Sequence, residues 1–326
     1  MKRVARRGGA LLLAALIAGG AYVADAAGAT GSPSSLPTLT QLVSAISGAA
    51  SQTRLPDPTI PLLGRAADGP TIAEYRGQKG CGDQTPGGGK NVQRETACTF
   101  GDRSAKRLLL VTGDSEADMW IPTLDAWGKA EHWRIARLVA FGCVPWAERP
   151  PIGTCGTFDA MVARWVRRHK PQIVFPVGLL ISSQWGWVSM SGAQMAREIE
   201  GMTSAWKPSG ARVLVPQNIP WFYNYSFPQE CLATYPRAVR RCNVDPRSKV
   251  VAEGLRVGMA LAAKAGAITI VPTEQLFCTP KTCPVLVGPW ILYADEHHFA
   301  RTWGAHIERA FASVFDPLAM GRANPR

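Results

Sequence analysis

The chain has 326 residues, of which 46% are hydrophobic and 18% are charged, and its formal net charge is +12. This positive charge is compatible with an anionic partner such as a membrane surface or an acidic polysaccharide. No run of Lys and Arg is interleaved with aromatic residues, which excludes nucleic acid as the expected partner.

The first residues have the pattern of a secretory signal peptide. Four basic residues precede an apolar stretch over residues 10–23, and small residues with an Ala-x-Ala-like site follow it. The apolar stretch is shorter than the roughly 20 residues that a membrane span needs. We predict a signal peptide over residues 1–27 and a protein that is secreted or held in the extracytoplasmic cell envelope. An uncleaved segment is the alternative, and it would be the only contact of the chain with a membrane.

The next part of the chain is predicted to have little regular structure. Residues 28–65 are rich in Ser, Thr, Pro, Gly and Ala, which predicts a flexible tether, although residues 39–46 could make a short helix. Residues 66–105 are predicted to form a loop-rich lead-in closed by a disulfide. The main domain is expected over residues 106–326.

Eight cysteines agree with export, because an even number of cysteines in an exported chain indicates disulfides. Their spacing favours pairs of sequential neighbours, which are Cys81–Cys98, Cys143–Cys155, Cys231–Cys242 and Cys278–Cys283. A metal site is the alternative for such residues. No Cys-x-x-Cys occurs and no histidine lies at ligand spacing from the cysteines, so we predict no metal and no cofactor.

From Lys106 onward, apolar runs alternate with amphipathic segments. The predicted strands are 107–112, 134–141, 172–178, 211–216 and 267–272. The predicted helices are 116–130, 156–169, 191–206, 247–265 and 299–313. This alternation predicts one α/β domain with a central parallel sheet of about five strands and helices on both faces.

Ser115 follows the first of these strands directly, in Gly113-Asp114-Ser115. The turn after such a strand is where α/β folds place their chemistry, and a helix N-terminus there favours developing negative charge. Near the C-terminus, Asp295 precedes His298 by three residues, which places both side chains on one face of a turn. His298 could therefore take the Ser115 proton while Asp295 holds the ring. The alternative is a helix-capping serine and a surface histidine pair.

The motifs extend well beyond the serine. Matching stretches are 98–102, 109–115, 120–125, 142–145, 278–284 and 293–299, together with Cys231 and Cys242. In their order and cysteine pattern they resemble the SGNH hydrolase domain that is appended to bacterial membrane O-acyltransferases of surface polysaccharides. The resemblance covers about residues 98–315. It implies a three-layer α/β/α, flavodoxin-like fold with Ser115, Asp295 and His298 as the catalytic triad.

The resemblance also implies an oxyanion hole. Its expected donors are the backbone N–H groups of Ser115 and Gly142 and the side-chain amide of Gln184, with Ser182 and Ser183 as alternatives to Gln184. Two features depart from the family pattern. The residue after the nucleophile is commonly histidine and here is Glu116, a carboxylate where negative charge must develop. The membrane-embedded half is also missing, so a separate membrane acyltransferase would have to supply any acyl group.

The resemblance predicts an exported esterase or O-acyltransferase that acts through an acyl-serine on acylated, above all acetylated, cell-surface carbohydrate. One alternative is a non-catalytic envelope module that binds polysaccharide or docks a partner. The other is a lipid or thioester hydrolase whose acyl pocket would be lined by the apolar residues within 179–187.

Overall fold

The computed structural model describes residues 36–56, 98–143, 155–178, 191–217, 219, 227–246 and 253–321. Several predicted features lie outside these ranges. They are the signal peptide, parts of the tether, residues 66–97 of the lead-in with Cys81, the proposed acyl pocket within 179–187, and the candidate donors Gln184, Ser182 and Ser183. Most of the predicted main domain lies within the described ranges.

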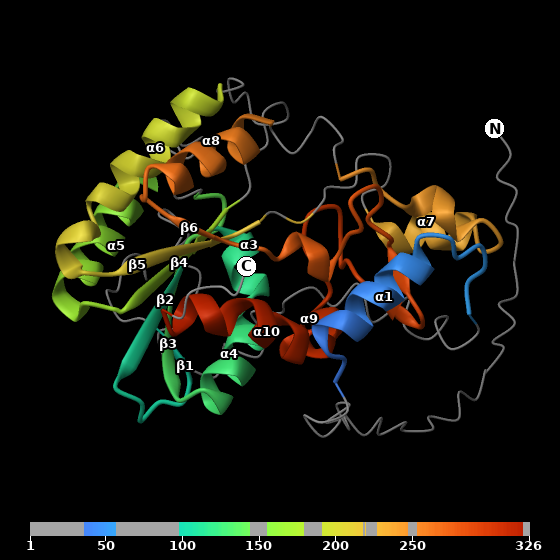
Figure 1. The fold of residues 1–326 in the computed structure, drawn as a ribbon, viewed down its shortest axis with the longest axis horizontal. Helices are drawn as coiled ribbons and strands as arrows, with labels where there is room; N and C mark the ends of the chain where they lie inside the picture. Colours follow the sequence, from blue (N-terminus) through green and yellow to red (C-terminus); the bar gives the residue numbers. More distant parts are fainter. Residues whose placement is uncertain are drawn as a thin grey trace, which may run out of the picture.

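A six-stranded sheet lies in the left half of the molecule as drawn in Figure 1, in the spatial order β1-β3-β2-β4-β5-β6. The five predicted strands are present and run parallel to one another, as β2 (Arg107–Gly113), β3 (Trp133–Val139), β4 (Ile173–Val177), β5 (Arg212–Pro216) and β6 (Thr269–Val271). The sixth strand, β1 (Cys98–Gly101), pairs antiparallel with β3 and was assigned to the loop-rich lead-in. It is only four residues long, too short for its apolar pattern to reveal it.

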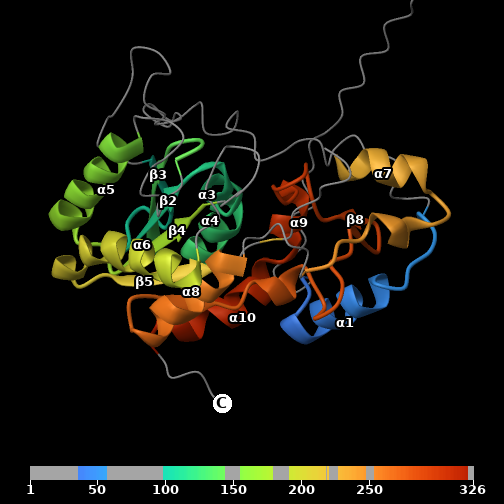
Figure 2. The ribbon, with the colours of Figure 1, turned by 90° about the horizontal axis from the view of Figure 1, so that it is seen from above.

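Helices cover both faces of this sheet, which confirms the three-layer α/β/α fold (Figures 1 and 2). On one face lie α5 (Cys155–His169), α6 (Gly192–Ser204) and α8 (Glu253–Lys264). On the other lie α4 (Ile121–Ala130) and α10 (Glu308–Ala319). The central strand β2 serves both layers, because Leu108 and Leu110 pack toward the first face and Leu109 and Val111 toward the second.

Two of the predicted helices are each divided in the structure. The helix expected over 116–130 consists of α3 (Ser115–Met119) and α4, with the break at Trp120. Pro122 explains this break, because proline lacks an N–H and is favoured in the first turn of a new helix. The helix expected over 299–313 consists of α9 (Arg301–His306) and α10.

The short helix that the sequence allowed within the predicted tether is present, as α1 (Leu39–Ala49). Thr38 and Gln41 form a capping box, in which each side chain binds the backbone N–H of the other residue. Leu42 and Ile46 are one turn apart and 1% exposed, because this face of α1 packs beside α10. The buried apolar face, together with the cap, gives this short segment its stability.

The remaining elements are short. They are α7 (Pro228–Thr234), the hairpin of β7 (Leu286–Val287) and β8 (Trp290–Ile291), and the 3-10 helices Lys207–Ser209, Val239–Cys242 and Glu274–Leu276. In the described ranges, none of the helices has the length and apolarity that crossing a membrane requires.

Disulfides close several of the connections between these elements. Three of the expected pairs are present, Cys143–Cys155, Cys231–Cys242 and Cys278–Cys283. Cys98 is also disulfide-bonded, and its expected partner Cys81 lies outside the described ranges. Disulfides in this number are typical of exported proteins.

Gly113, the last residue of β2, should not tolerate a side chain. Its φ is +137°, and a Cβ there would lie 1.6 Å from the carbonyl oxygen of Val177. We expect Gly113→Ala to lower the free energy of unfolding by more than about 2 kcal/mol, measured by urea denaturation, or to prevent folding. Gly201→Ala is the matched control, because Gly201 lies in α6 with open space around it. That variant should gain up to about 1 kcal/mol, and equal losses in both would contradict the prediction.

Candidate active site

Ser115 lies at the carboxyl end of β2, between its two parallel neighbours β3 and β4. The chain continues from β2 to β3 on one side and returns to β4 on the other, so this is the topological switch point of the sheet. Ala140 N–H donates to the Gly113 carbonyl at 2.9 Å, and Asp114 N–H donates to the Val177 carbonyl at 3.3 Å. Both flanking strand ends thus hold the turn that presents Ser115.

Helix α3 starts at Ser115 itself, with Asp114 as its N-cap. The Asp114 carboxylate accepts a hydrogen bond from the Glu116 N–H at 2.9 Å. Asp114 therefore braces the turn that carries Ser115. The cap places the Ser115 N–H at the positive end of a short helix.

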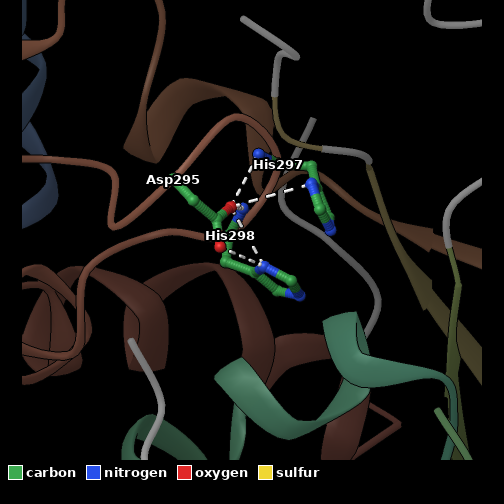
Figure 3. A group of neighbouring side chains, drawn as sticks. All are labelled: Asp295, His297 and His298. Carbon is green, nitrogen blue, oxygen red and sulfur yellow. Dashed lines mark hydrogen bonds and ion pairs between the residues drawn. The ribbon is translucent and has the colours of Figure 1, made fainter. Parts of the chain in front are cut away.

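Asp295 lies in a tight loop in which its own neighbours hold its carboxylate (Figure 3). Asp295 Oδ1 accepts the backbone N–H groups of His297 at 2.9 Å and His298 at 2.8 Å. A hydrogen bond from Ala294 N–H to the His298 carbonyl, at 2.8 Å, joins the two ends of the loop. These contacts orient the second carboxylate oxygen toward the His298 ring.

The structure brings Ser115, Asp295 and His298 together although they come from opposite ends of the domain. His298 Nδ1 is 2.8 Å from Asp295 Oδ2, and His298 Nε2 is 2.8 Å from Ser115 Oγ. A chain of two hydrogen bonds therefore runs from carboxylate to imidazole to hydroxyl. Such a chain can accept the hydroxyl proton and stabilise the imidazolium that forms.

The ionisable groups around this chain differ in their protonation. Burial raises the pKa of Asp295, but its hydrogen bond and attraction to His298 and the His297 N–H outweigh this and lower the pKa to about 2. Burial lowers the pKa of His297 to about 4, and electrostatic repulsion between the two neighbouring histidines adds to this effect. At neutral pH, Asp295 is thus ionised and His297 is neutral. The His297 ring lies 4.0 Å from that of His298.

Glu116 is only 1% exposed, although it follows Ser115 directly. Burial raises the pKa of Glu116 well above its usual value, and the negative charges of Asp114 and Asp295 raise it further. Its Oε1 has no hydrogen-bond partner within the ranges that the structure describes. Glu116 therefore keeps its proton to a higher pH than an exposed glutamate and adds less negative charge than its identity suggests.

A buried ion pair below the site was not predicted from the sequence. Arg137 of β3 binds Asp118 of α3 through two contacts, Nε to Oδ1 and Nη2 to Oδ2, the latter at 2.8 Å. Both side chains are 2% exposed. The pair ties the helix that begins with Ser115 to the strand next to β2. Its signal in the sequence is an arginine within the apolar strand 133–139, since a buried charge requires a partner.

Only some of the expected oxyanion-hole donors lie within the described ranges. Gly142 lies in the exposed turn after β3, at the same edge of the sheet as Ser115, with φ of +74°. Gln184 lies outside the described ranges. The roles of Ser115 N–H, Gly142 and Gln184 as donors stay predictions.

Comparison with known proteins gives a family and a fold. A family model described as an SGNH domain (fused to AT3 domains) matches residues 81–313. The periplasmic domain of a lipopolysaccharide acetyltransferase from Salmonella ser. Paratyphi A is similar in structure at 11% identity, with a TM-score of 0.53 over 67% of this chain and 85% of that chain. A GDSL-like lipase from Bacteroides thetaiotaomicron matches at 13% identity, with a TM-score of 0.42 over 78% and 99%. The search of curated proteins found no match.

Replacing Glu116 should make the protein less sensitive to alkaline pH. Because the pKa of Glu116 is raised on folding, the native state binds more protons than the unfolded state above about pH 4.5. Its contribution to stability is fully present below that pH and is lost as pH rises through the folded pKa. We expect the free energy of unfolding of Glu116→Gln, relative to the wild type, to increase from about pH 5 to about pH 9.

The measurement is urea denaturation of both proteins across this range. Glu230→Gln is the control, because Glu230 is exposed on α7. A stability difference for Glu116→Gln that stays constant with pH, like that of the control, would contradict the protonation of Glu116.

Proposed function

Because the chain belongs to the family of SGNH domains that are fused to AT3 domains, we propose that it is an exported serine esterase or O-acyltransferase. Its substrate in this proposal is acylated, above all acetylated, cell-surface carbohydrate. The observation that carries the proposal is the hydrogen-bonded chain from Asp295 through His298 to Ser115, at 2.8 Å for each contact. Export is supported by the signal-like N-terminal segment and by the disulfides.

In the first half of the reaction, His298 Nε2 takes the proton of the Ser115 hydroxyl while Oγ attacks the ester carbonyl. The tetrahedral intermediate carries its negative charge at the N-terminus of α3, where the Ser115 N–H is the first donor. When the intermediate collapses, the alkoxide leaving group takes the proton from His298. The acyl group then remains on Ser115.

In the second half, an acceptor hydroxyl gives its proton to His298 Nε2 and attacks the carbonyl of the acyl-serine. When the resulting intermediate collapses, the bond between the acyl group and Ser115 Oγ breaks, and Oγ takes the proton back from His298. Water as the acceptor gives an esterase, and a sugar hydroxyl gives a transferase. Throughout, Asp295 holds the Nδ1 proton and stabilises the imidazolium. Both outcomes use the same residues, so the acceptor decides the reaction.

The proposed partner is a membrane acyltransferase of the AT3 type, because the family pairs its SGNH domain with such domains. In this arrangement the partner delivers the acyl group and the present chain passes it to, or removes it from, the carbohydrate. No cofactor takes part in the proposed reaction.

The proposal predicts that Ser115→Ala and His298→Ala lose ester hydrolysis. Acetate release from p-nitrophenyl acetate should fall by about 10³-fold or more in either variant, because each removes an essential group of the same unit. His132→Ala is the control, since His132 is paired with Asp102 on the surface, and it should keep the wild-type rate. The double variant should be no slower than the single ones.

A second measurement distinguishes an unsuitable test ester from a serine that is not activated. A fluorophosphonate labels only an activated serine, so it should modify Ser115 in the wild type and not in His298→Ala. If the wild type neither exceeds Ser115→Ala in rate nor takes the label, the proposed chemistry is wrong.

A further inference from the structure

Three side chains that can bind metal ions come together in the loop that carries the histidine of the triad. Asp295, His297 and His298 each offer one ligand atom, and these atoms all lie within 4.8 Å of one another. Their side chains are 29%, 23% and 13% exposed, while the His297 Nδ1 atom itself is buried. In Figure 3, the two imidazole rings lie next to each other beside the Asp295 carboxylate.

The separations between the ligand atoms suit a small tetrahedral ion. His298 Nδ1 is 2.8 Å from Asp295 Oδ2, and His297 Nδ1 is 3.7 Å from Asp295 Oδ1. Ligands of tetrahedral zinc at about 2.1 Å lie roughly 3.4 Å apart, between these two values. Glu296 Oε1, also 3.7 Å from His297 Nδ1, adds a second carboxylate on the outer side. An ion at this place takes the position of the proton between His298 Nδ1 and Asp295 Oδ2, so these two atoms must move apart to bind it.

The loop itself is held in place without the ion. The backbone N–H groups of His297 and His298 both bind Asp295 Oδ1, at 2.9 and 2.8 Å. The carboxylate and the two rings are therefore oriented by the turn before an ion arrives, which lowers the cost of binding. Two imidazoles and a carboxylate favour borderline ions such as Zn²⁺ over Mg²⁺ or Ca²⁺.

We propose that Asp295, His297 and His298 bind a divalent transition-metal ion, for which Zn²⁺ is the probe, and that the bound ion switches Ser115 off. The second part of this proposal rests on the proposed function, and the first does not. The site differs from the cysteine-based metal site that the sequence argued against.

The inhibition follows from the tautomer of His298. In the active arrangement, Nδ1 carries the ring proton and donates it to Asp295, which leaves Nε2 free to accept the Ser115 proton. A metal ion on Nδ1 takes the lone pair of that atom, so the single proton of the neutral ring moves to Nε2 through solvent. Nε2–H is a donor and cannot act as a base toward Ser115. The ion thus blocks proton transfer without touching the serine.

The chain supplies its own control for this proposal. Asp102 and His132 form a second His–carboxylate pair, with Oδ2 and Nδ1 at 3.0 Å, and the His132 side chain is 76% exposed. Within the described ranges this pair is not part of a cluster of three ligands. This pair tests whether any exposed histidine next to a carboxylate is sufficient to bind Zn²⁺.

The test is equilibrium dialysis of the purified protein against Zn²⁺, with the metal content measured. We expect one Zn²⁺ per chain in the wild type and in His132→Ala, and binding weaker by at least about tenfold in His297→Ala. His297→Gln serves if the alanine variant does not fold. Mg²⁺ should not compete, because it prefers oxygen ligands.

Fluorophosphonate labelling of Ser115 is then measured with and without Zn²⁺, each variant serving as its own metal-free reference. Zn²⁺ should suppress labelling in the wild type, a chelator should restore it, and His297→Ala should require at least about tenfold more Zn²⁺ for the same effect. Binding that is absent, or that does not depend on His297, overturns the site. Labelling that is unchanged by bound Zn²⁺ overturns the switch. If the metal-free protein takes no label at all, the proposed function fails, while dialysis still decides the metal site.

Discussion

The packing of Trp120 against Phe299 is the contact on which the site depends. The ring centroids are 4.9 Å apart, and the two side chains are 1% and 0% exposed. Trp120 ends the helix that begins with Ser115, and Phe299 directly follows His298. The same core contact therefore fixes both ends of the hydrogen bond between His298 and Ser115, whose positions are 183 residues apart. Phe175, Phe277 and Phe311 surround Trp120 and make this junction part of the main core.

A second constraint acts on Ser115 from the side of the sheet. The ion pair of Asp118 and Arg137 fixes α3 to β3. Removing two charges from water is costly, and their attraction repays it only with good geometry, so the pair contributes orientation more than stability. With the backbone contacts that Ala140 and Val177 make to the β2 turn, it holds Ser115 from the sheet side while Trp120 and Phe299 hold His298 from the core. A proton transfer over 2.8 Å requires this degree of preorganisation.

The sequence predicts the parallel sheet well because the central strands are mostly apolar, and it identifies Ser115 because the serine follows the continuous apolar run 108–111. The spacing of Asp295 and His298 also follows from the chain alone, since both lie in one turn. The sequence does not reveal β1, whose four residues gain their place only by pairing with β3. The packing of α1 beside α10 and the pairing of Arg137 with Asp118 are equally non-local. Such partners are set by the folded core, and no local pattern encodes them.

Glu116 shows most clearly how the fold changes the meaning of a residue. In the sequence it is a second negative charge next to the nucleophile, where it would oppose the oxyanion. In the structure, burial and the neighbouring carboxylates raise its pKa, while the contacts of Asp295 with His298 lower that of Asp295 to about 2. The two carboxyl groups near Ser115 therefore have different pKa values. Asp295 is ionised and pairs with the histidine, whereas Glu116 holds its proton to a higher pH. The carboxylates of Asp295 and Glu296 each lie 3.7 Å from His297 Nδ1, so the negative charge of this loop is concentrated around the His297 ring.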